Sequence, residues 1–255
     1  MRTGFGRHVF GCGAILFGVI TLAWRSFNTW QQIQPLGNIP HREILAYLAA
    51  AIEILGGLAI QFTGTARIGA IAVGCIYSTF ALLWVPRILA QPGVWDIWAN
   101  FFEQFSQVAG AMIVYALGTR SDSLRRWPLA RIGYLSFGIC AVSFMLEQLF
   151  YLSATAAFVP RWIPPGQMFW AVATTVAFAL AAIALLTGRS ALLASRLLLA
   201  MIVGFQLLVW VPRAFADPHQ LINWAGNAEN LSIAGAAWIV ADYLGAQRSK
   251  SINRI

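Results

Sequence analysis

Glu53 is the residue of this sequence best placed to do chemistry within an apolar segment. It lies near the middle of an apolar run, about 15 Å from either end if the run is a helix rising 1.5 Å per residue. Ala49, Ala50, Gly56 and Gly57 are three or four positions away and share its helix face. Small residues let another helix approach closely, so we expect the carboxyl to point into a helix bundle.

Three hydroxyl groups are expected at the depth of Glu53, those of Thr21, Tyr77 and Ser78. No Lys or Arg is expected there, so we expect a neutral carboxyl that hydrogen-bonds to one of them, because an isolated buried charge is costly. An ionisable group inside a membrane is a candidate proton or substrate site. The alternative is a neutral carboxyl that only holds two helices together.

A second group of polar residues belongs to a segment that the chain contains twice. Trp84-Val85-Pro86-Arg87 recurs as Trp210-Val211-Pro212-Arg213, an offset of 126 residues. The same offset relates four further pairs: Pro92 and Pro218, Trp98 and Trp224, Glu103 and Glu229, Ser106 and Ser232. Eight matches at one offset without a gap indicate a tandem duplication. We interpret each copy as the end of one helix, a polar turn, and the start of the next helix.

Arg87 and Arg213 allow two interpretations. They are either a cationic rim that attracts an anionic substrate or partner, or they close the turn by pairing with Glu103 and Glu229. The first turn of a helix favours such a carboxylate. We predict that the four repeated tryptophans anchor the chain at the membrane interface: Trp84, Trp98, Trp210 and Trp224.

Other charged residues have no counterpart in the opposite repeat. Arg25 and Glu147 lie near the outer ends of equivalent helices, and we predict an ion pair between them that joins the two halves. His41 and His219 both lie on the outer side, where they could meet. Every histidine, including His8, falls at the end of a span, so the sequence predicts no metal centre and no haem within the bundle.

The composition identifies the elements that must position these residues. The 255-residue chain is 59% hydrophobic and 10% charged, with a mean hydropathy of +0.70, whereas soluble domains carry about 25% charged residues. The sequence therefore predicts an all-α integral membrane protein with the lipid bilayer as its surroundings. The net charge of +8 does not indicate nucleic acid, because the basic residues lie in short gaps between apolar runs.

Eight runs are long enough to cross a bilayer, which takes about 20 apolar residues. They are residues 9–27, 43–62, 67–85, 100–118, 131–152, 167–187, 192–211 and 223–244. With a cytoplasmic N-terminus, 12 of the 17 Lys and Arg residues fall on the cytoplasmic side. The sequence thus predicts a multi-pass inner-membrane protein with both termini in the cytoplasm and both Trp-Val-Pro-Arg segments outside.

The duplication divides the chain into two parallel repeats. The predicted domains are a four-helix membrane repeat at 1–118, a cytoplasmic linker at 119–130, a second four-helix repeat at 131–245 and a basic cytoplasmic tail at 246–255. An even number of helices per repeat gives both units one orientation, related by an axis along the membrane normal. Ala177 occupies the position of Glu53 in the second repeat, so a single active centre would lie in the first.

The middle of the first repeat contains two adjacent runs of interest. They read Glu53-Ile54-Leu55-Gly56-Gly57-Leu58 and Thr63-Gly64-Thr65-Ala66-Arg67-Ile68-Gly69. A glutamate followed by two glycines, leading through a Thr-Gly turn into the next helix, resembles the DoxX-like family of prokaryotic four-helix membrane proteins. The resemblance covers residues 9–118 and is weaker over 131–245. It implies a membrane subunit associated with respiratory or sulfur redox chemistry, similar to the membrane part of a thiosulfate:quinone oxidoreductase.

Three functions stay open at this point, and with them whether the protein is an enzyme and what its oligomeric state is. One is a redox-associated subunit without a redox centre of its own, in which Glu53 donates to a bound quinone or the protein docks a soluble or membrane redox partner. A second is a small-molecule transporter or permeation protein with Glu53 as its proton or substrate site. The third is a structural or assembly protein.

Overall fold

The computed structural model describes residues 4–24, 35, 37, 40–118 and 126–252, and within these ranges the chain forms helices and no strand. Seven long helices are continuous: α1 (Gly6–Trp24), α2 (Arg42–Gln61), α3 (Ala66–Ala90), α4 (Trp95–Leu117), α5 (Arg126–Phe150), α7 (Gln167–Thr187) and α10 (Leu221–Ile252). An eighth rod is composed of α8 (Ala191–Phe205), the π-helix η2 (Gln206–Trp210) and α9 (Val211–Ala216). A short helix, α6 (Leu152–Phe158), follows α5. The prediction of an all-α fold is confirmed for this part of the chain.

Six of these rods are long and apolar enough to cross a membrane. They are α1, α2, α3, the Pro128–Phe150 part of α5, α7, and the Ala191–Ala216 rod. A membrane-embedded protein is therefore confirmed. Helices α4 and α10 lie where the fourth and eighth spans, residues 100–118 and 223–244, are predicted, but they do not reach the same apolar composition.

The composition of α4 and α10 follows from their position in the bundle. Helix α10 packs against α1, α8 and α4, and α4 packs against α3, α5 and α10, so protein encloses both helices. Both bury many polar side chains: Gln104, Ser106, Gln107, Asn223, Asn227, Glu229, Asn230 and Ser232. A helix that contacts other helices can satisfy such groups internally, whereas a lipid-facing helix cannot.

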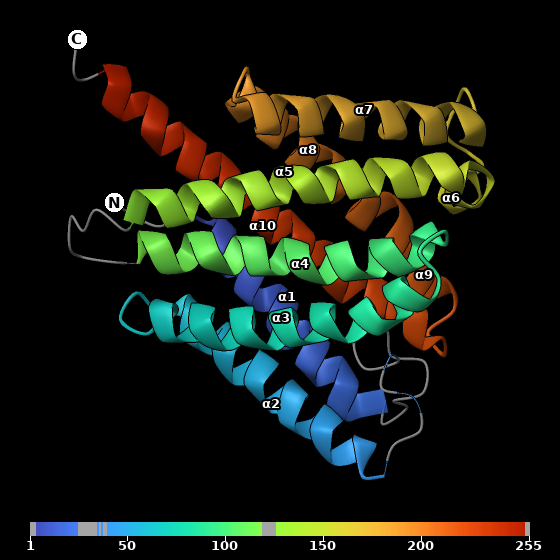
Figure 1. The fold of residues 1–255 in the computed structure, drawn as a ribbon. Helices are drawn as coiled ribbons and strands as arrows, with labels where there is room; N and C mark the ends of the chain where they lie inside the picture. The colour runs from blue at the N-terminus through green and yellow to red at the C-terminus, as the bar shows by residue number, and fades with distance from the viewer. Residues whose placement is uncertain (1–3, 25–34, 36, 38–39, 119–125, 253–255) are drawn as a thin grey trace.

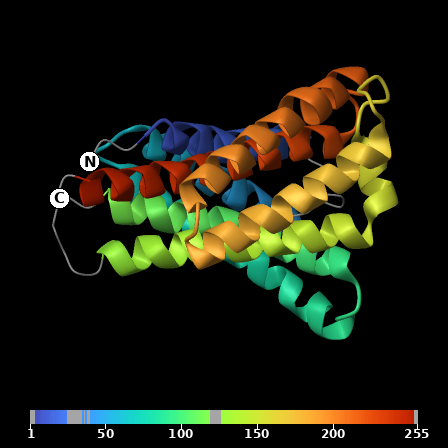
Figure 2. The same cartoon turned by 90° about the horizontal axis from the view of Figure 1, so that it is seen from above.

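The rods form a closed ring of neighbours, and two members of the ring, α4 and α10, also pack against each other across its middle. Successive helices pack side by side from α1 to α5, then α7 and α8, and α10 returns to pack on α1 (Figure 1). Figure 2 shows α10 between α1 on one side and α8 on the other. The first helix of each repeat thus packs on the last helix of the other repeat, α1 on α10 and α5 on α4.

The two ends of the bundle differ in what they contain. Helix α1 begins and α10 ends at the same end, which we name the terminal end (Figure 1). The other end, here the opposite end, contains α6, α9 and the turn from α3 to α4 (Figure 1). The predicted linker overlaps α5, which begins at Arg126, and residues 119–125 lie outside the described ranges. Helix α10 continues to Ile252 and so includes much of the predicted tail.

Glycines allow the closest helix contacts. A methyl group added at Gly13 of α1 would lie 2.7 Å from the Cα of Ser232 on α10. A methyl group added at Gly57 of α2 would lie 2.6 Å from the carbonyl oxygen of Gly11 on α1. Any side chain at these positions requires the backbones to move apart, so the glycines set the spacing between α1 and its two neighbours.

We predict that Gly13→Ala destabilises the protein by about 1–3 kcal/mol, because the added methyl group overpacks the contact between α1 and α10. The measurement is the thermal unfolding midpoint of the purified protein in mild detergent. Gly64→Ala is the matched control, since a methyl group at Gly64 meets no atom within 4 Å. Equal midpoints for the two variants would contradict this account of the packing.

Candidate functional site

Glu53 lies in the interior of the bundle, with 1% of its surface exposed. Its neighbours on the helix face contact two other helices, since Gly57 lies against Gly11 of α1 and Gly56 lies against Val73 of α3. The other face of α2 carries exposed apolar side chains, among them Leu55 at 66%. Helix α2 therefore has a face of small residues, which packs against α1 and α3 and includes Glu53, and a face of large apolar residues that points outward.

The hydroxyl of Tyr77 is the nearest polar group that α3 brings to Glu53. It lies beside the Glu53 carboxyl and the Ser232 hydroxyl, so α2, α3 and α10 converge there. Neither the Tyr77 nor the Ser232 hydroxyl completes a hydrogen bond of good geometry with a described residue, although both side chains are fully buried. The Tyr77 ring is held by Phe17 and Phe80, with ring centroids 6.2 and 5.8 Å away.

Two further polar side chains complete this region from α4 and α10. The side-chain amide of Gln104 donates to the Glu229 carboxylate at 3.2 Å, and Gln104 is fully buried. The Glu229 carboxyl is also within electrostatic range of the Tyr77 hydroxyl. We name Glu53, Tyr77, Gln104, Glu229 and Ser232 the central polar cluster. The Tyr77 and Ser232 hydroxyls and the Gln104 side-chain carbonyl are buried polar atoms without a hydrogen-bond partner of good geometry among the described residues, and because such atoms are rare, their concentration makes this cluster the candidate functional site.

Further carboxyl groups lie between the central polar cluster and the opposite end, close enough to influence one another, although the described structure joins them by no hydrogen bond. Asp96 is exposed in the first turn of α4, and Glu147 is partly buried near the end of α5. The Glu147 carboxyl is within electrostatic range of both Asp96 and Glu229. Acidic groups thus extend from the surface to Glu229 and, through Tyr77, to Glu53.

The core between Glu53 and the terminal end has a different character. Helices α1, α3, α4 and α10 bury apolar side chains there, including Phe10, Val73, Ile113 and Val240, each with no exposed surface. Side chains of this kind cannot exchange protons or bind ions. The central polar cluster is therefore approached by acidic groups from one end, and mainly apolar side chains, with the buried amide of Gln107, lie between it and the other end.

The second repeat contains a separate hydrogen-bonded network. Gln206 donates to Asn227 at 2.6 Å and accepts from Asn230 at 2.7 Å, while Asn227 donates to the Trp210 carbonyl at 2.7 Å. These bonds join α10 to the π-helix η2. The first repeat has Phe80, Phe101 and Gln104 at the corresponding positions, so α3 stays a regular α-helix through Pro86. The same Trp-Val-Pro-Arg sequence therefore has different local structures in the two repeats.

Of the two interpretations of Arg213, the one that pairs it with Glu229 is wrong. Arg213 donates to Asn223 at 3.4 Å and stacks on Phe158, with its guanidinium 4.4 Å from the ring centre. Glu229 is eight residues into α10, about 12 Å from the helix start at 1.5 Å per residue, and points to Gln104. Asn223, only two residues into the helix, is the residue that Arg213 can reach.

The repeated turns are closed by tryptophan instead. The indole N–H of Trp98 donates to the Pro92 carbonyl at 3.1 Å, and that of Trp224 donates to the Pro218 carbonyl at 3.0 Å. Trp84 is not an exposed interface anchor as predicted, because it is 3% exposed, and the Arg87 guanidinium lies 5.2 Å from its ring centre. The six-residue spacing between Pro and Trp, which occurs in both repeats, is thus explained by this hydrogen bond across the turn.

Other predicted site residues lie apart from the central polar cluster. The hydroxyls of Thr21 and Ser78 donate to carbonyls of their own helices, at 3.0 and 2.7 Å. His41 and His219 are exposed at the opposite end. Glu103 begins the polar segment of α4, and its carbonyl accepts from the Ser106 hydroxyl at 2.7 Å.

The predicted ion pair between Arg25 and Glu147 cannot be placed, since Arg25 lies outside the described residues. Among the described residues, the charged groups that influence Glu147 are the carboxyls of Asp96 and Glu229.

The side-chain amides inside the bundle are not among the site residues predicted from the sequence: Gln104, Gln107, Gln206, Asn223, Asn227 and Asn230. The last three recur at intervals of four and three residues, which places them on one helix face and was a readable signal.

Within the described ranges, no group of three or more His, Cys, Asp or Glu side chains is arranged to hold a metal ion. Comparisons with protein-family models, with curated proteins and with solved structures find no match for this chain. The chemistry of the central polar cluster is therefore argued from its own residues.

We predict that Asn227→Leu lowers the free energy of unfolding by about 1–3 kcal/mol, because the Gln206 side-chain N–H and the Trp210 carbonyl each lose their hydrogen bond to Asn227. Thermal unfolding in detergent measures the change. Asn100→Leu on α4 is the control, since Asn100 donates only to the Asp96 carbonyl of its own helix, at 2.7 Å. If Asn100→Leu is as destabilising as Asn227→Leu, the network is not what joins α10 to η2.

Proposed function

We propose that the protein is a proton-conducting or proton-coupled transporter in which Glu53 and Glu229 are intramembrane proton sites. The observation that supports this is the series of carboxyl groups from exposed Asp96 through Glu147 and Glu229 to Glu53. Carboxyl chains within membrane bundles are typical of proton pathways. Tyr77 can relay a proton between the two glutamates, because a phenol both donates and accepts.

The closed side of the site supports transport rather than free permeation. The carboxyl series approaches Glu53 from the opposite end, and the apolar side chains of Phe10, Val73 and Ile113 separate it from the terminal end. A proton that reaches Glu53 can leave toward the terminal end only after these helices move. The described arrangement corresponds to one state of an alternating-access cycle, with access from the opposite end.

We also propose that all eight rods cross the membrane, as two parallel four-helix units in a DoxX-like arrangement. The exchange of contacts, α1 on α10 and α5 on α4, supports this, as does the enclosure of α4 and α10 by other helices. An inner membrane location with both termini in the cytoplasm follows from the distribution of Lys and Arg. The opposite end is then the outer end, and protons enter from outside.

The proposed role of Glu53 and Glu229 predicts how fast protons enter lipid vesicles that contain the protein. After an external acid step, vesicles containing the wild-type protein should acidify faster than protein-free vesicles, as reported by a trapped pH dye. Glu53→Gln and Glu229→Gln should each lower the initial rate by roughly a hundredfold, because an amide cannot exchange the proton. Glu53→Asp should retain part of the rate.

Glu43→Gln is the control for this experiment, since Glu43 is exposed in the first turn of the same helix and should leave the rate unchanged. Two results would contradict the proposal. One is a wild-type rate no higher than that of protein-free vesicles. The other is a wild-type rate in both glutamine variants of the central polar cluster.

The proposed orientation has its own test. Alkaline phosphatase fused after the last residue should be inactive, and a fluorescent protein fused there should be bright, because both termini are proposed to be cytoplasmic. Fusions within the turn between α3 and α4 should give the reverse. An active phosphatase at the C-terminus would invert the orientation and with it the side from which protons enter.

A role with quinone or a redox partner, implied by the DoxX-like resemblance, stays a prediction. In that role the Glu53 carboxyl would donate to a quinone oxygen. The described surroundings of Glu53 are tightly packed, with glycine contacts to α1 and α3, so a quinone would need to separate these helices. Mass spectrometry of quinone and proteins that co-purify in mild detergent tests this role independently of the vesicle assay.

A further inference from the structure

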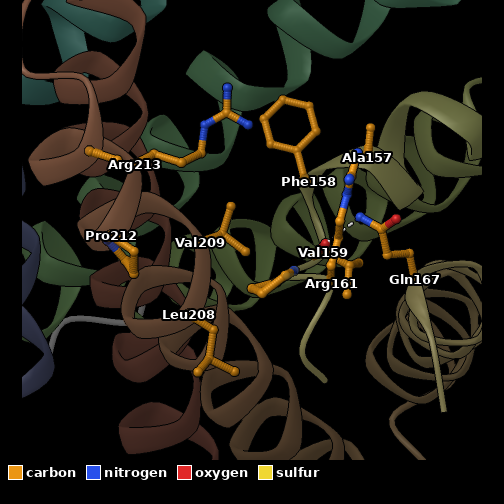
Figure 3. A pocket seen from close by; sticks show the side chains of 11 residues that line it. Ala157, Phe158, Val159, Arg161, Gln167, Leu208, Val209, Pro212 and Arg213 are labelled. Atoms are coloured by element: carbon orange, nitrogen blue, oxygen red, sulfur yellow. Dashed lines mark hydrogen bonds between the residues drawn. The ribbon is translucent and has the colours of Figure 1, made fainter. Parts of the chain in front are cut away.

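A second candidate site belongs to the second repeat and lies where that repeat reaches the opposite end of the bundle, away from the central polar cluster. A cavity of about 310 Å³ opens between the α6–α7 connection and the rod formed by η2 and α9 (Figure 3). Ligand pockets in proteins measure ~300–1,000 Å³, so this volume holds a headgroup and a few methylene groups but not a whole lipid. Its lining contains two cations, Arg161 and Arg213, and no acidic residue.

Arg213 is fixed in place at the cavity wall. Its guanidinium stacks on the Phe158 ring at 4.4 Å (Figure 3), and its Nε donates to Asn223 at 3.4 Å. Both contacts are to neutral groups, and no carboxylate of the described residues pairs with this arginine. The guanidinium therefore has further N–H groups with which to bind an anion.

The connection that supplies Arg161 is also fixed. The side-chain amide of Gln167, the first residue of α7, donates to the Val159 carbonyl at 2.6 Å across the connection (Figure 3). Arg161 itself is exposed, so its long side chain can turn onto a bound group. The cavity thus combines a rigid cation and an adaptable one on opposite walls.

The surroundings of the cavity indicate that its ligand comes from the membrane. Leu208, Val209 and Pro212 form its apolar wall. The surface beside it is strongly apolar, since Trp162 is 73% exposed and Phe215 is 78% exposed. Exposed apolar side chains next to arginines at the end of a membrane bundle are typical of the interface, where lipid headgroups lie.

We propose that this cavity binds the phosphate of an anionic phospholipid, with Arg161 and Arg213 contacting the phosphate and Leu208 and Val209 contacting the start of an acyl chain. Two arginines in a lining that holds no acidic residue select an anion, and a planar guanidinium matches the geometry of phosphate oxygens. The apolar wall selects an amphiphile over a free ion. Occupancy would hold the α6–α7 connection against α9 and thereby stabilise the second repeat.

The test uses the purified full-length protein in mild detergent, titrated with phosphatidylglycerol or phosphatidylcholine, with native mass spectrometry and the thermal unfolding midpoint as readouts. Phosphatidylglycerol should bind and raise the midpoint, and phosphatidylcholine should do neither. The double variant Arg161→Gln, Arg213→Gln should bind phosphatidylglycerol roughly tenfold to thirtyfold more weakly, because both cations near the phosphate are lost.

The single variant Arg161→Gln guards against misfolding, since Arg161 is exposed and makes no described hydrogen bond, and it should weaken phosphatidylglycerol binding by roughly fivefold. Arg189→Gln, an exposed arginine at the terminal end, should bind as the wild type does. Unchanged phosphatidylglycerol binding in the double variant would overturn the proposal. Binding of glycerol phosphate as tight as that of the lipid would overturn its membrane source.

Discussion

The close contact between α1 and α10 is the constraint on which the rest of the structure depends. Gly13 meets the backbone of Ser232 there, so the first and last long helices of the chain pack backbone against backbone. This contact closes the ring of helices and places α10 in the middle of the bundle. Because α10 lies there, Glu229 and Ser232 face Tyr77 and, through it, Glu53. A larger residue at Gly13 would move two members of the central polar cluster away from the other three.

The membrane fold could be predicted from composition and from apolar runs, and Glu53 could be predicted to face inward from the small residues around it. Apolar composition alone does not identify α4 and α10 as spans. Their hydropathy is too low for a lipid-facing span, yet enclosure by other helices makes it acceptable. Enclosure depends on which helices become neighbours, and a single sequence contains little information on that. The duplication indicated that the last helix of each repeat is equivalent but not that the two meet at the centre.

The site could be predicted only in part, for a similar reason. Intramembrane carboxyls stand out in a sequence because they are rare, whereas amides such as Gln104 and Asn227 are read as ordinary polar residues. Their importance comes from pairing across helices, as in the bond between Gln104 and Glu229 at 3.2 Å. The expectation for Arg213 failed because it used distance along the chain. Asn223 is closer to the start of α10 than Glu229, and the depth of Glu229 excludes it from the turn.

The tryptophan-closed turns have a consequence for how the chain enters a membrane. The indole of Trp98 reaches the Pro92 carbonyl, that of Trp224 reaches the Pro218 carbonyl, and that of Trp170 reaches the Pro164 carbonyl, each across six residues. Such a bond needs no other part of the protein, so it can form as soon as the second helix of each pair begins to emerge during synthesis. Neighbouring helices can then insert as ready-made hairpins, and the two repeats meet afterwards. The repeated Pro and Trp positions of the duplicated segment therefore have a local role in the turn that does not depend on the central polar cluster.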